Sequence, residues 1–376
     1  MGKIIAVDGN WMCGKRTGMG TVAYNVVKQW QTTKDIRVIL YLPKELDKEY
    51  ADTIRQHGIE TKILGKANYI KWEQFLLPRA LREDGGDVLW SPYNTAPLMV
   101  NARRVITIND VIYMTTPWQD VPTLYKKAGM LYRRIVVPKA AKKADKIITI
   151  SHYAKQELCR LFPYVEDKID VIYDSASKDT TALSAKEQEI FFNQHGICKP
   201  YILAFGSLEK RKNTLRIIKA YEKLPEQIKK SYQLVLFGFR GYDGSEVEHY
   251  LQVNRRNLDI KILGFVSEKE KNTLYQQCEF FVFPSLSEGF GIPVLEAYAN
   301  QAAVITSNTT SLPEVAGDAA VLVNPESIEA ICSAMLYVLH WNDKEKLQHL
   351  KKANKQLMNF DWQKTADKLW QVMSSI

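Results

Sequence analysis

The segment SEGFGIPVLE places two carboxylates, Glu288 and Glu296, eight residues apart. A carboxylate accepts two hydrogen bonds, which suits the vicinal hydroxyls of a ribose or a hexose. Gly289 and Gly291 lie between the acids, and glycine lets a ligand approach the backbone closely. Pro293 is typical of a first helical turn, so Glu288 is expected on a loop and Glu296 one turn into a helix. The pattern predicts a sugar or nucleotide site; the alternative for Glu296 is a solvated helix face.

A second segment, GSLEKRKN, holds three consecutive cations, Lys210, Arg211 and Lys212, between an apolar run and a helix expected to start near Thr214. Positive charge at a helix N-terminus opposes the helix dipole unless an anion binds there too. Arginine forks and lysine point charges together suit a diphosphate. The segment therefore predicts a diphosphate site, and its alternative is a solvated basic turn.

Two glycines near the N-terminus, Gly18 and Gly20, open a helix predicted over Thr21–Trp30. The first-turn N–H groups of a helix can face an anion, and a side chain at either glycine would block a phosphate. The pattern indicates a second phosphate contact, with a plain tight turn as the alternative.

Short apolar runs alternate with amphipathic segments along the whole chain. The predicted strands are Lys3–Val7, Arg37–Tyr41, Val88–Trp90, Val105–Ile108, Lys146–Ile150, Ile169–Ile172, Tyr201–Phe205, Gln233–Phe237, Ile260–Leu263, Phe280–Phe283, Ala303–Thr306 and Ala320–Leu322. Further helices are predicted over Tyr153–Leu161, Leu215–Leu224, Ser267–Gln277, Val294–Asn300 and Ile328–Leu339. Such alternation is typical of parallel sheets with helices on both faces, so the predicted fold class is α/β with two doubly wound domains. Ligands are expected at the carboxyl ends of the strands, in a central cleft that the two domains face.

The length of 376 residues favours two domains. The polar segment Asp174–Lys199 separates the two sets of strands and places a hinge near Ser175–Leu183. The predicted domains are residues 1–178 and 179–359. Residues 360–376 form an amphipathic terminal helix with two tryptophans, which needs an apolar surface to pack against.

The composition is that of a folded soluble protein, with 46% apolar and 25% charged residues. The sequence has neither a run of about 18 apolar residues nor a secretory leader pattern at its N-terminus. Its five cysteines are scattered singly, as in a reduced protein. A cytoplasmic location is therefore expected.

The positive charge is uneven. Residues 1–180 hold 28 Lys and Arg against 20 Asp and Glu, whereas residues 181–376 hold 23 against 22. Within the first part, residues 122–146 contain eight basic residues and one acid, interleaved with apolar residues. This stretch is either a solvated helix face or a patch for an anionic membrane surface or a phosphorylated acceptor, at about 1 kcal/mol for each basic residue near a charged bilayer. No nucleic-acid-recognition signature is present, so nucleic acid is not an expected partner.

With two Rossmann-like halves, an early G-x-G, a basic turn and an E-x7-E pattern written SEGFGIPVLE, the chain resembles the retaining family 4 glycosyltransferases of the GT-B fold over nearly its whole length. The resemblance implies transfer of a hexose-type sugar from a nucleotide diphosphate sugar to an acceptor hydroxyl, with retention of anomeric configuration. It implies no cofactor and no metal. The acceptor would be a glycan or a lipid-linked sugar, in polysaccharide or glycolipid assembly, so a peripheral position at the inner membrane face is also expected. Residues 1–178 would bind the acceptor and 179–359 the donor, and the helix at 360–376 would return to the first domain.

The resemblance also implies roles for individual residues. Glu288 would contact the donor sugar and stabilise a positively charged transition state, Glu296 would bind the ribose, and Arg211 and Lys212 would neutralise the leaving diphosphate. The donor would further be lined by Gly18, Gly20, Gly264, Phe265, Val266, Gly289, Phe290 and Gly291. Asn109 occupies a catalytic position where many relatives have histidine, and Ser207 stands where some have a second arginine.

Asn109 can exchange hydrogen bonds with a sugar but cannot carry a proton at neutral pH. One alternative is therefore a degenerate GT-B protein that binds donor or glycan without turnover. Another is a nucleotide-sugar epimerase or phosphorylase on the same fold. Acceptor choice is expected to depend on loops around Trp11, Trp72, Tyr93, Asn94, Tyr113 and Trp118.

Overall fold

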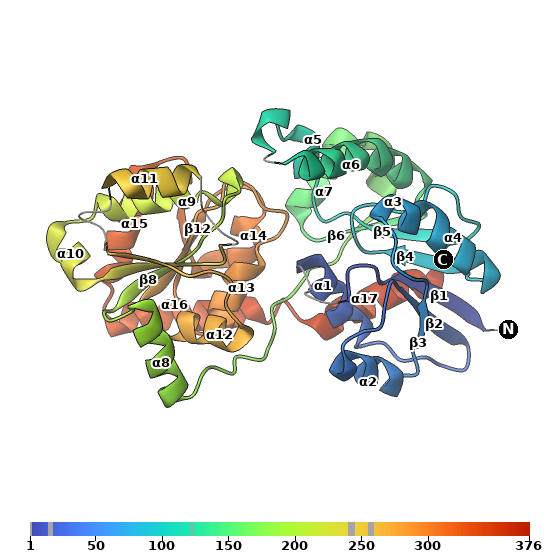
Figure 1. Cartoon of the computed structure of the whole chain (residues 1–376), viewed down its shortest axis with the longest axis horizontal. Helices are drawn as coiled ribbons and strands as arrows, with labels where there is room; N and C mark the ends of the chain where they lie inside the picture. The colour runs from blue at the N-terminus through green and yellow to red at the C-terminus, as the bar shows by residue number, and fades with distance from the viewer. Residues whose placement is uncertain (1, 14–17, 122, 240–244, 255–258) are drawn as a thin grey trace. The chain divides into compact units, whose positions relative to one another are not determined.

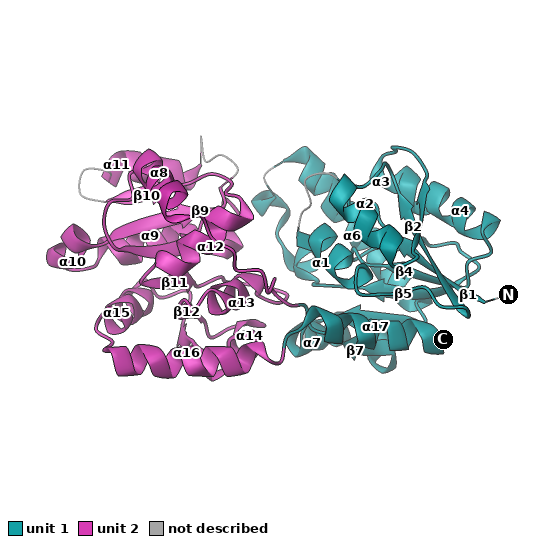
Figure 2. Cartoon of the chain, turned by 90° about the horizontal axis from the view of Figure 1, so that it is seen from below, with its two compact units in different colours: residues 1–174, 360–376 teal, residues 175–359 magenta. Residues whose placement is uncertain are grey.

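A computed structural model describes residues 2–13, 18–121, 123–239, 245–254 and 259–376 (Figure 1). The chain divides into two compact units, coloured separately in Figure 2. Unit 1 consists of residues 1–174 and 360–376, and unit 2 of residues 175–359. The division after Asp174 falls at the start of the polar segment in which the hinge is predicted.

The described part of unit 1 forms a seven-stranded parallel sheet in the order β3-β2-β1-β4-β5-β6-β7. Its strands are β1 (Lys3–Asp8), β2 (Ile36–Leu42), β3 (Glu60–Ile63), β4 (Val88–Ser91), β5 (Arg103–Thr107), β6 (Lys146–Thr149) and β7 (Ile169–Val171). Its helices are α1 (Gly18–Val27), α2 (Lys48–Gln56), α3 (Tyr69–Lys71), the π-helical η1 (Trp72–Leu76), α4 (Leu77–Glu83), α5 (Ile112–Thr115), η2 (Trp118–Asp120), α6 (Leu124–Lys143), α7 (His152–Leu161), η3 (Pro163–Lys168) and α17 (Trp362–Ser375).

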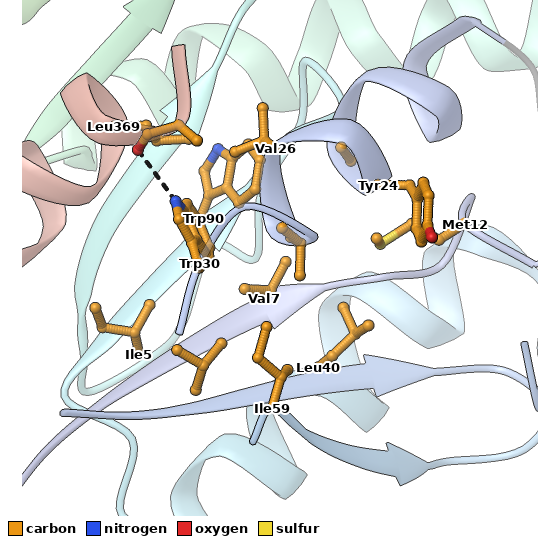
Figure 3. Packing of buried hydrophobic residues seen from close by; sticks show 14 of the residues in the cluster. Ile5, Val7, Met12, Tyr24, Val26, Trp30, Leu40, Ile59, Trp90 and Leu369 are labelled. Atoms are coloured by element: carbon orange, nitrogen blue, oxygen red, sulfur yellow. Dashed lines mark hydrogen bonds between the residues drawn. The ribbon is translucent and has the colours of Figure 1, made fainter. Parts of the chain in front are cut away.

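Helices cover both faces of this sheet. On one face, α1 and α17 pack against alternate residues of the central strands, such as Val7 (Figure 3). Trp30 Nε1 donates a hydrogen bond to the Ala366 carbonyl at 3.1 Å, and the Trp30 ring lies 5.6 Å from that of Trp370. On the other face, α4 and α6 bury their own apolar sides. The terminal helix therefore belongs to the core of unit 1.

The described part of unit 2 forms a six-stranded parallel sheet in the order β10-β9-β8-β11-β12-β13. Its strands are β8 (Tyr201–Phe205), β9 (Gln233–Phe237), β10 (Ile260–Ile262), β11 (Phe280–Phe283), β12 (Val304–Ser307) and β13 (Val321–Val323). Its helices are α8 (Ala185–His195), η4 (Lys210–Lys212), α9 (Thr214–Glu222), α10 (Glu226–Ser231), α11 (Glu246–Asn254), α12 (Glu268–Gln277), α13 (Ile292–Ala299), α14 (Leu312–Ala316), η6 (Gly317–Ala319), α15 (Ile328–Leu339) and α16 (Asp343–Leu357). The predicted α/β class with two doubly wound parallel sheets is confirmed.

The strand order of unit 2 reverses between β8 and β11, which are neighbours in the sheet although far apart in sequence. Parallel neighbours end at the same edge, so the segments that follow these two strands begin side by side. Such a switch point is where open α/β sheets bind ligands. The segment GSLEKRKN (residues 206–213), called the basic turn below, follows β8. The loop that contains Glu288, called the acidic loop below, follows β11.

Candidate functional site

The basic turn and the acidic loop are fastened together by backbone and side-chain hydrogen bonds. The Arg211 carbonyl accepts a hydrogen bond from the Leu286 amide at 2.7 Å, and Ser285 Oγ lies 2.8 Å from the same oxygen. Asn213 has a positive φ of 63° at the start of α9, and its buried Nδ2 donates to the Pro284 and Pro325 carbonyls at 2.8 and 2.7 Å. These bonds fix the turn against the loop. The contacts of Asn213 with Pro284 and Pro325 were not predicted from the sequence.

Glu288 lies at the centre of this junction. Its Oε2 is 2.8 Å from Arg211 Nη1, and its Oε1 is 2.7 Å from Lys212 Nζ. Ser285 Oγ donates a third hydrogen bond to Oε1 at 2.6 Å. Burial by itself would raise the pKa of Glu288, but Lys212 and Arg211 outweigh it and hold the pKa below its usual value. Glu288 is therefore an ionised carboxylate at neutral pH.

The two cations differ in their surroundings. Lys212 is packed between aromatic rings, with Nζ 5.4 Å from the Phe205 ring centre and 5.0 Å from that of Phe283. Burial lowers the pKa of Lys212, and the charge of Glu288 opposes that shift. Arg211 is less buried and also pairs with Glu209 at 2.7 Å. The sequence analysis predicted an anion beside these cations. In the structure that anion is the carboxylate of Glu288.

The residues that follow Glu288 are shaped by packing. Ser311 Oγ lies 3.0 Å from the Glu288 carbonyl oxygen and 2.6 Å from that of Phe290. The Phe290 side chain is buried, so only its backbone could meet a ligand. Gly291 has a φ of 129°, and a Cβ there would lie 2.7 Å from Leu312 Cδ2. Gly291 is thus required by its backbone conformation, apart from any ligand, whereas the Leu312 side chain is flexible and could shift.

Glu296 forms an ion pair with Lys271 that was not predicted. Its Oε1 is 2.7 Å from Lys271 Nζ, and the Tyr275 hydroxyl donates to Oε2 at 3.3 Å. Both partners come from α12, which follows the loop that contains Gly264, Phe265 and Val266. Burial would lower the pKa of Lys271, but Glu296 and Glu268 raise it above its usual value. The cation beside the predicted ribose contact therefore keeps its charge.

Ser207 and Phe265 are two further residues of unit 2 that were predicted to contact the donor. Ser207 lines a pocket of about 640 Å³ on the turn after β8, together with Lys210 and Leu286. Its backbone N–H donates to Thr214 Oγ1 at 3.0 Å, and its Oγ accepts from the Glu209 amide at 3.2 Å. Phe265 is exposed on the loop before α12.

Gly18, Gly20 and Asn109 belong to unit 1, so their meeting with Glu288 remains a prediction. A Cβ at Gly18 would meet nothing within 4 Å, whereas one at Gly20 would lie 2.0 Å from the Trp11 carbonyl oxygen. Gly20 thus allows α1 to pack against the preceding loop. The backbone N–H of Asn109 donates a hydrogen bond to Asn94 Oδ1 at 2.7 Å. The side-chain oxygen of Asn109, Oδ1, is buried with no hydrogen-bond partner.

The aromatic residues expected near the acceptor are mostly in the core. The side chains of Trp72, Tyr93 and Tyr113 are buried, so their rings cannot serve as platforms for a sugar. Trp72 Nε1 instead donates to Asp8 Oδ1 at 2.9 Å. Trp118 is exposed, next to α6.

Comparison with known families gives two matches. The description "Glycosyl transferases group 1" matches residues 186–357, and "Glycosyltransferase Family 4" matches residues 16–175.

Relatives with assigned names include O-antigen chain mannosyltransferase B of Escherichia coli, which is 32% identical over 63% of this chain and 61% of its own length. The serotype-specific mannosyltransferase WbdA of E. coli is 31% identical over 66% of this chain and 32% of its own length. O-antigen chain mannosyltransferase RfbU of Salmonella typhimurium is 28% identical over 65% of this chain and 62% of its own length. The match thus spans less than two thirds of each relative.

Solved structures share the whole fold. Anabaena Alr3699/HepE in complex with UDP and glucose superposes with a TM-score of 0.75 at 16% identity, covering all of both chains. WaaG, a glycosyltransferase involved in lipopolysaccharide biosynthesis, superposes with a TM-score of 0.71 at 16% identity, covering 98% of this chain and 99% of its own. With a family 4 domain in unit 1 and a group 1 domain in unit 2, this chain belongs to the glycosyltransferases of the GT-B fold.

Proposed function

We propose that this chain is a retaining glycosyltransferase that transfers a hexose-type sugar from a nucleotide diphosphate sugar to an acceptor hydroxyl, in the assembly of a cell-surface polysaccharide or glycolipid. The observation that carries the proposal is the junction of Glu288 with Arg211 and Lys212 at the switch point of unit 2. Three relatives are named mannosyltransferases, so mannose is the first hexose to test.

The junction has the charges that this reaction needs. Loss of a diphosphate from a sugar develops positive charge at the anomeric carbon and negative charge on the leaving group. The ionised Glu288 stabilises the first charge, while Arg211 and Lys212 stabilise the second. Because nearby cations lower the pKa of Glu288, its role is electrostatic and it does not donate a proton. Retention, and a reaction that needs no metal ion, are proposed on the resemblance to family 4 enzymes.

Donor binding exchanges one set of ion pairs for another. The diphosphate takes Arg211 and Lys212, and Glu288 is released towards the sugar. The cations stay paired throughout, and Glu288 exchanges them for hydrogen bonds and the developing positive charge of the sugar, so none of the three buried charges is left uncompensated, which would be costly. Glu296, held by Lys271, accepts hydrogen bonds from the ribose. Unit 1 provides the acceptor site, with Asn109 donating a hydrogen bond to a sugar hydroxyl.

The proposal is tested by incubating the purified protein with GDP-mannose and with UDP-, GDP-, ADP- and dTDP-linked hexoses, with and without glycan acceptors. We expect transfer or slow hydrolysis of one donor, with the anomeric configuration of the product, read by NMR, the same as that of the donor. An inverted product would refute retention. Formation of an epimer would identify an epimerase, and binding of nucleoside diphosphates without turnover of any donor would identify a degenerate protein.

A further inference from the structure

A pocket of about 730 Å³ lies at the amino ends of the central strands of unit 1. Among its lining residues, Lys3 begins β1 and Arg103 begins β5, while Asp87 and Asp145 directly precede β4 and β6. The amino ends of parallel strands share one edge of a sheet, and the acceptor is expected at the opposite edge, where the carboxyl ends lie. The pocket is therefore separate from the site of the proposed reaction.

Positive charge is concentrated in this pocket. The cationic side chains that line it are those of Lys3, Arg103, Arg104 and Lys143. Lys143 Nζ donates a hydrogen bond to the Leu98 carbonyl at 2.9 Å, and Arg104 Nη2 donates one to the Val100 carbonyl at 2.9 Å. Because carbonyl groups carry no net charge, these bonds orient Lys143 and Arg104 without neutralising them.

The other two cations are engaged within the chain. Lys3 Nζ donates hydrogen bonds to the backbone oxygens of Ser374 and Ile376 at 2.8 and 2.6 Å. Arg103 Nη1 lies 2.7 Å from Asp145 Oδ1. Arg104 and Lys143 are therefore the cations that a ligand in the pocket would meet.

The charge of Arg104 is only partly compensated. Within the described part of the chain, its Nε is buried and has no hydrogen-bond partner. Burial lowers the pKa of Arg104, and the charge of Asp145 offsets part of that shift. Buried donors are normally satisfied in folded proteins, and a charge withdrawn from water normally lies beside a countercharge. An anion bound beside this guanidinium would supply a countercharge.

The pocket also contains acceptors for hydroxyl groups. Asp87 Oδ2 accepts a hydrogen bond from the backbone N–H of Ile4 at 2.8 Å, and Asp145 Oδ2 accepts one from that of Arg104 at 2.8 Å. These bonds fix both carboxylates in place. Each carboxylate oxygen has a second lone pair, so it can accept a further hydrogen bond from a ligand hydroxyl. Asn101 lines the same pocket and can both donate and accept.

We propose that this pocket of unit 1 binds a small sugar phosphate. Arg104 and Lys143 hold the phosphate, since an arginine fork and a lysine point charge both suit its oxygens. Asp87, Asn101 and Asp145 bind the sugar hydroxyls. A volume of about 730 Å³ leaves room for a sugar beside the phosphate. The described lining residues include no aromatic ring on which a nucleotide base could stack, which favours a phosphorylated sugar over a nucleotide.

The proposal concerns unit 1 alone and does not depend on transferase activity. The test is calorimetry of the full chain at low salt with mannose 6-phosphate, mannose 1-phosphate, inorganic phosphate and mannose. We expect at least one of the two hexose phosphates to bind several-fold more tightly than inorganic phosphate or mannose does. An absence of binding by both hexose phosphates would overturn the proposal. Equal affinity for inorganic phosphate would refute recognition of the sugar, and equal affinity for mannose would refute recognition of the phosphate.

Lysines at the end of α6 provide a variant and its matched control. Lys142 and Lys143 are both exposed and belong to the basic stretch predicted at residues 122–146, of which Pro122 lies outside the described residues. Helix α6, like every other described helix, is not both long and apolar enough to cross a membrane. Lys143 lines the pocket, whereas Lys142 is not among its described lining residues. The two lysines thus differ in the pocket but not in charge.

Lys143→Gln should weaken hexose phosphate binding roughly tenfold or more, because a charge-assisted hydrogen bond to the phosphate is lost. Its melting temperature should match that of the wild type, since the side chain is exposed. Arg104→Met should weaken binding at least as much, and Lys143→Gln decides the matter if Arg104→Met does not fold. Lys142→Gln should bind as the wild type does. Equal loss in Lys142→Gln and Lys143→Gln would refute the assignment to the pocket.

A hexose phosphate could instead bind the proposed diphosphate site of unit 2, so the two sites are compared directly. Lys212→Met should lose affinity for a nucleoside diphosphate and keep its affinity for the hexose phosphate. Lys143→Gln should do the reverse. Loss of hexose phosphate binding in Lys212→Met, with none in Lys143→Gln, would overturn the proposal and place that ligand at the diphosphate site.

Discussion

Lys212 Nζ lies 2.7 Å from Glu288 Oε1, and the two side chains are only 13% and 10% exposed. The residue proposed to stabilise the sugar and a residue proposed to hold the diphosphate are therefore a buried ion pair. Removing one partner of such a pair typically costs about 3–5 kcal/mol, because the other charge is left uncompensated. Each substitution here consequently affects both ligand binding and folding stability, and the two effects must be measured separately.

Glu288→Gln should lower turnover by roughly a hundredfold or more, because a preorganised charge at the reacting centre is lost. The affinity for a nucleoside diphosphate should not fall, and should rise several-fold, because Arg211 and Lys212 no longer exchange an internal carboxylate for the ligand. Steady-state kinetics and calorimetry with the nucleoside diphosphate alone would check both. The control is Glu209→Gln, which removes the more exposed partner of Arg211 and should leave turnover within a few-fold of wild type. Full turnover in Glu288→Gln would refute the assigned role.

Lys212→Met should weaken nucleoside diphosphate binding roughly tenfold or more, since a charge-assisted hydrogen bond is worth about 1.5–3 kcal/mol. Lys230→Met, at an exposed position of α10, should bind as the wild type does. The double variant Lys212→Met with Glu288→Gln should regain stability in urea unfolding, because no buried charge is left unpaired, but should not regain binding. If both single lysine variants bind equally well, the diphosphate site is elsewhere.

Much of the fold could be predicted because most of its strands are apolar runs between turns. The strand β3, ETKI, is not predicted, because it lies at the edge of its sheet and its residues are exposed or partly exposed. Helix α1 begins at Gly18, earlier than the predicted Thr21, because Gly20 lets it pack closely on the preceding loop.

The individual site residues could be predicted, but their pairing could not. Glu288 and Lys212 are 76 positions apart, and their contact depends on β8 and β11 being neighbours in the sheet. Lys271 comes within 2.7 Å of Glu296 only through the packing of α12 beside α13. Local patterns carry information on turns and helices, whereas these contacts follow from strand order.

The two N-terminal glycines should differ when changed to alanine. Gly20→Ala should destabilise unit 1 by about 1–3 kcal/mol, because the new Cβ would lie 2.0 Å from the Trp11 carbonyl oxygen and the loop must shift. Gly18→Ala has open space and should leave the midpoint of urea unfolding unchanged or slightly raised. If Gly18→Ala nevertheless binds a nucleoside diphosphate more weakly, the loss of affinity indicates that Gly18 contacts the ligand, because the variant has no folding defect. Equal stability of the two variants would contradict the packing assigned to Gly20.

Asp8→Asn should remove part of the pH dependence of stability. Asp8 is the last residue of β1. Its Oδ1 accepts hydrogen bonds from Trp72 Nε1 and from the backbone N–H of Asn10, whereas its Oδ2 is buried without a hydrogen-bond partner. Burial raises the pKa of Asp8 from 3.8 to about 7, against the opposing effect of these two hydrogen bonds. The folded chain therefore keeps this proton at pH values where the unfolded chain has lost it.

It follows that the contribution of Asp8 to stability is greatest below pH 3.8 and is lost as the pH rises to about 7. The total change is on the order of 4 kcal/mol, at 1.36 kcal/mol for each pH unit by which the pKa is raised. Asparagine does not titrate, so the stability of Asp8→Asn relative to wild type should increase across this window and level off above it. The measurement is the free energy of unfolding in urea for both proteins between pH 5 and pH 8. Taking the difference cancels the titration of Asp174, whose pKa burial also raises to about 7. A difference that stays constant with pH would show that Asp8 is ionised in the folded protein.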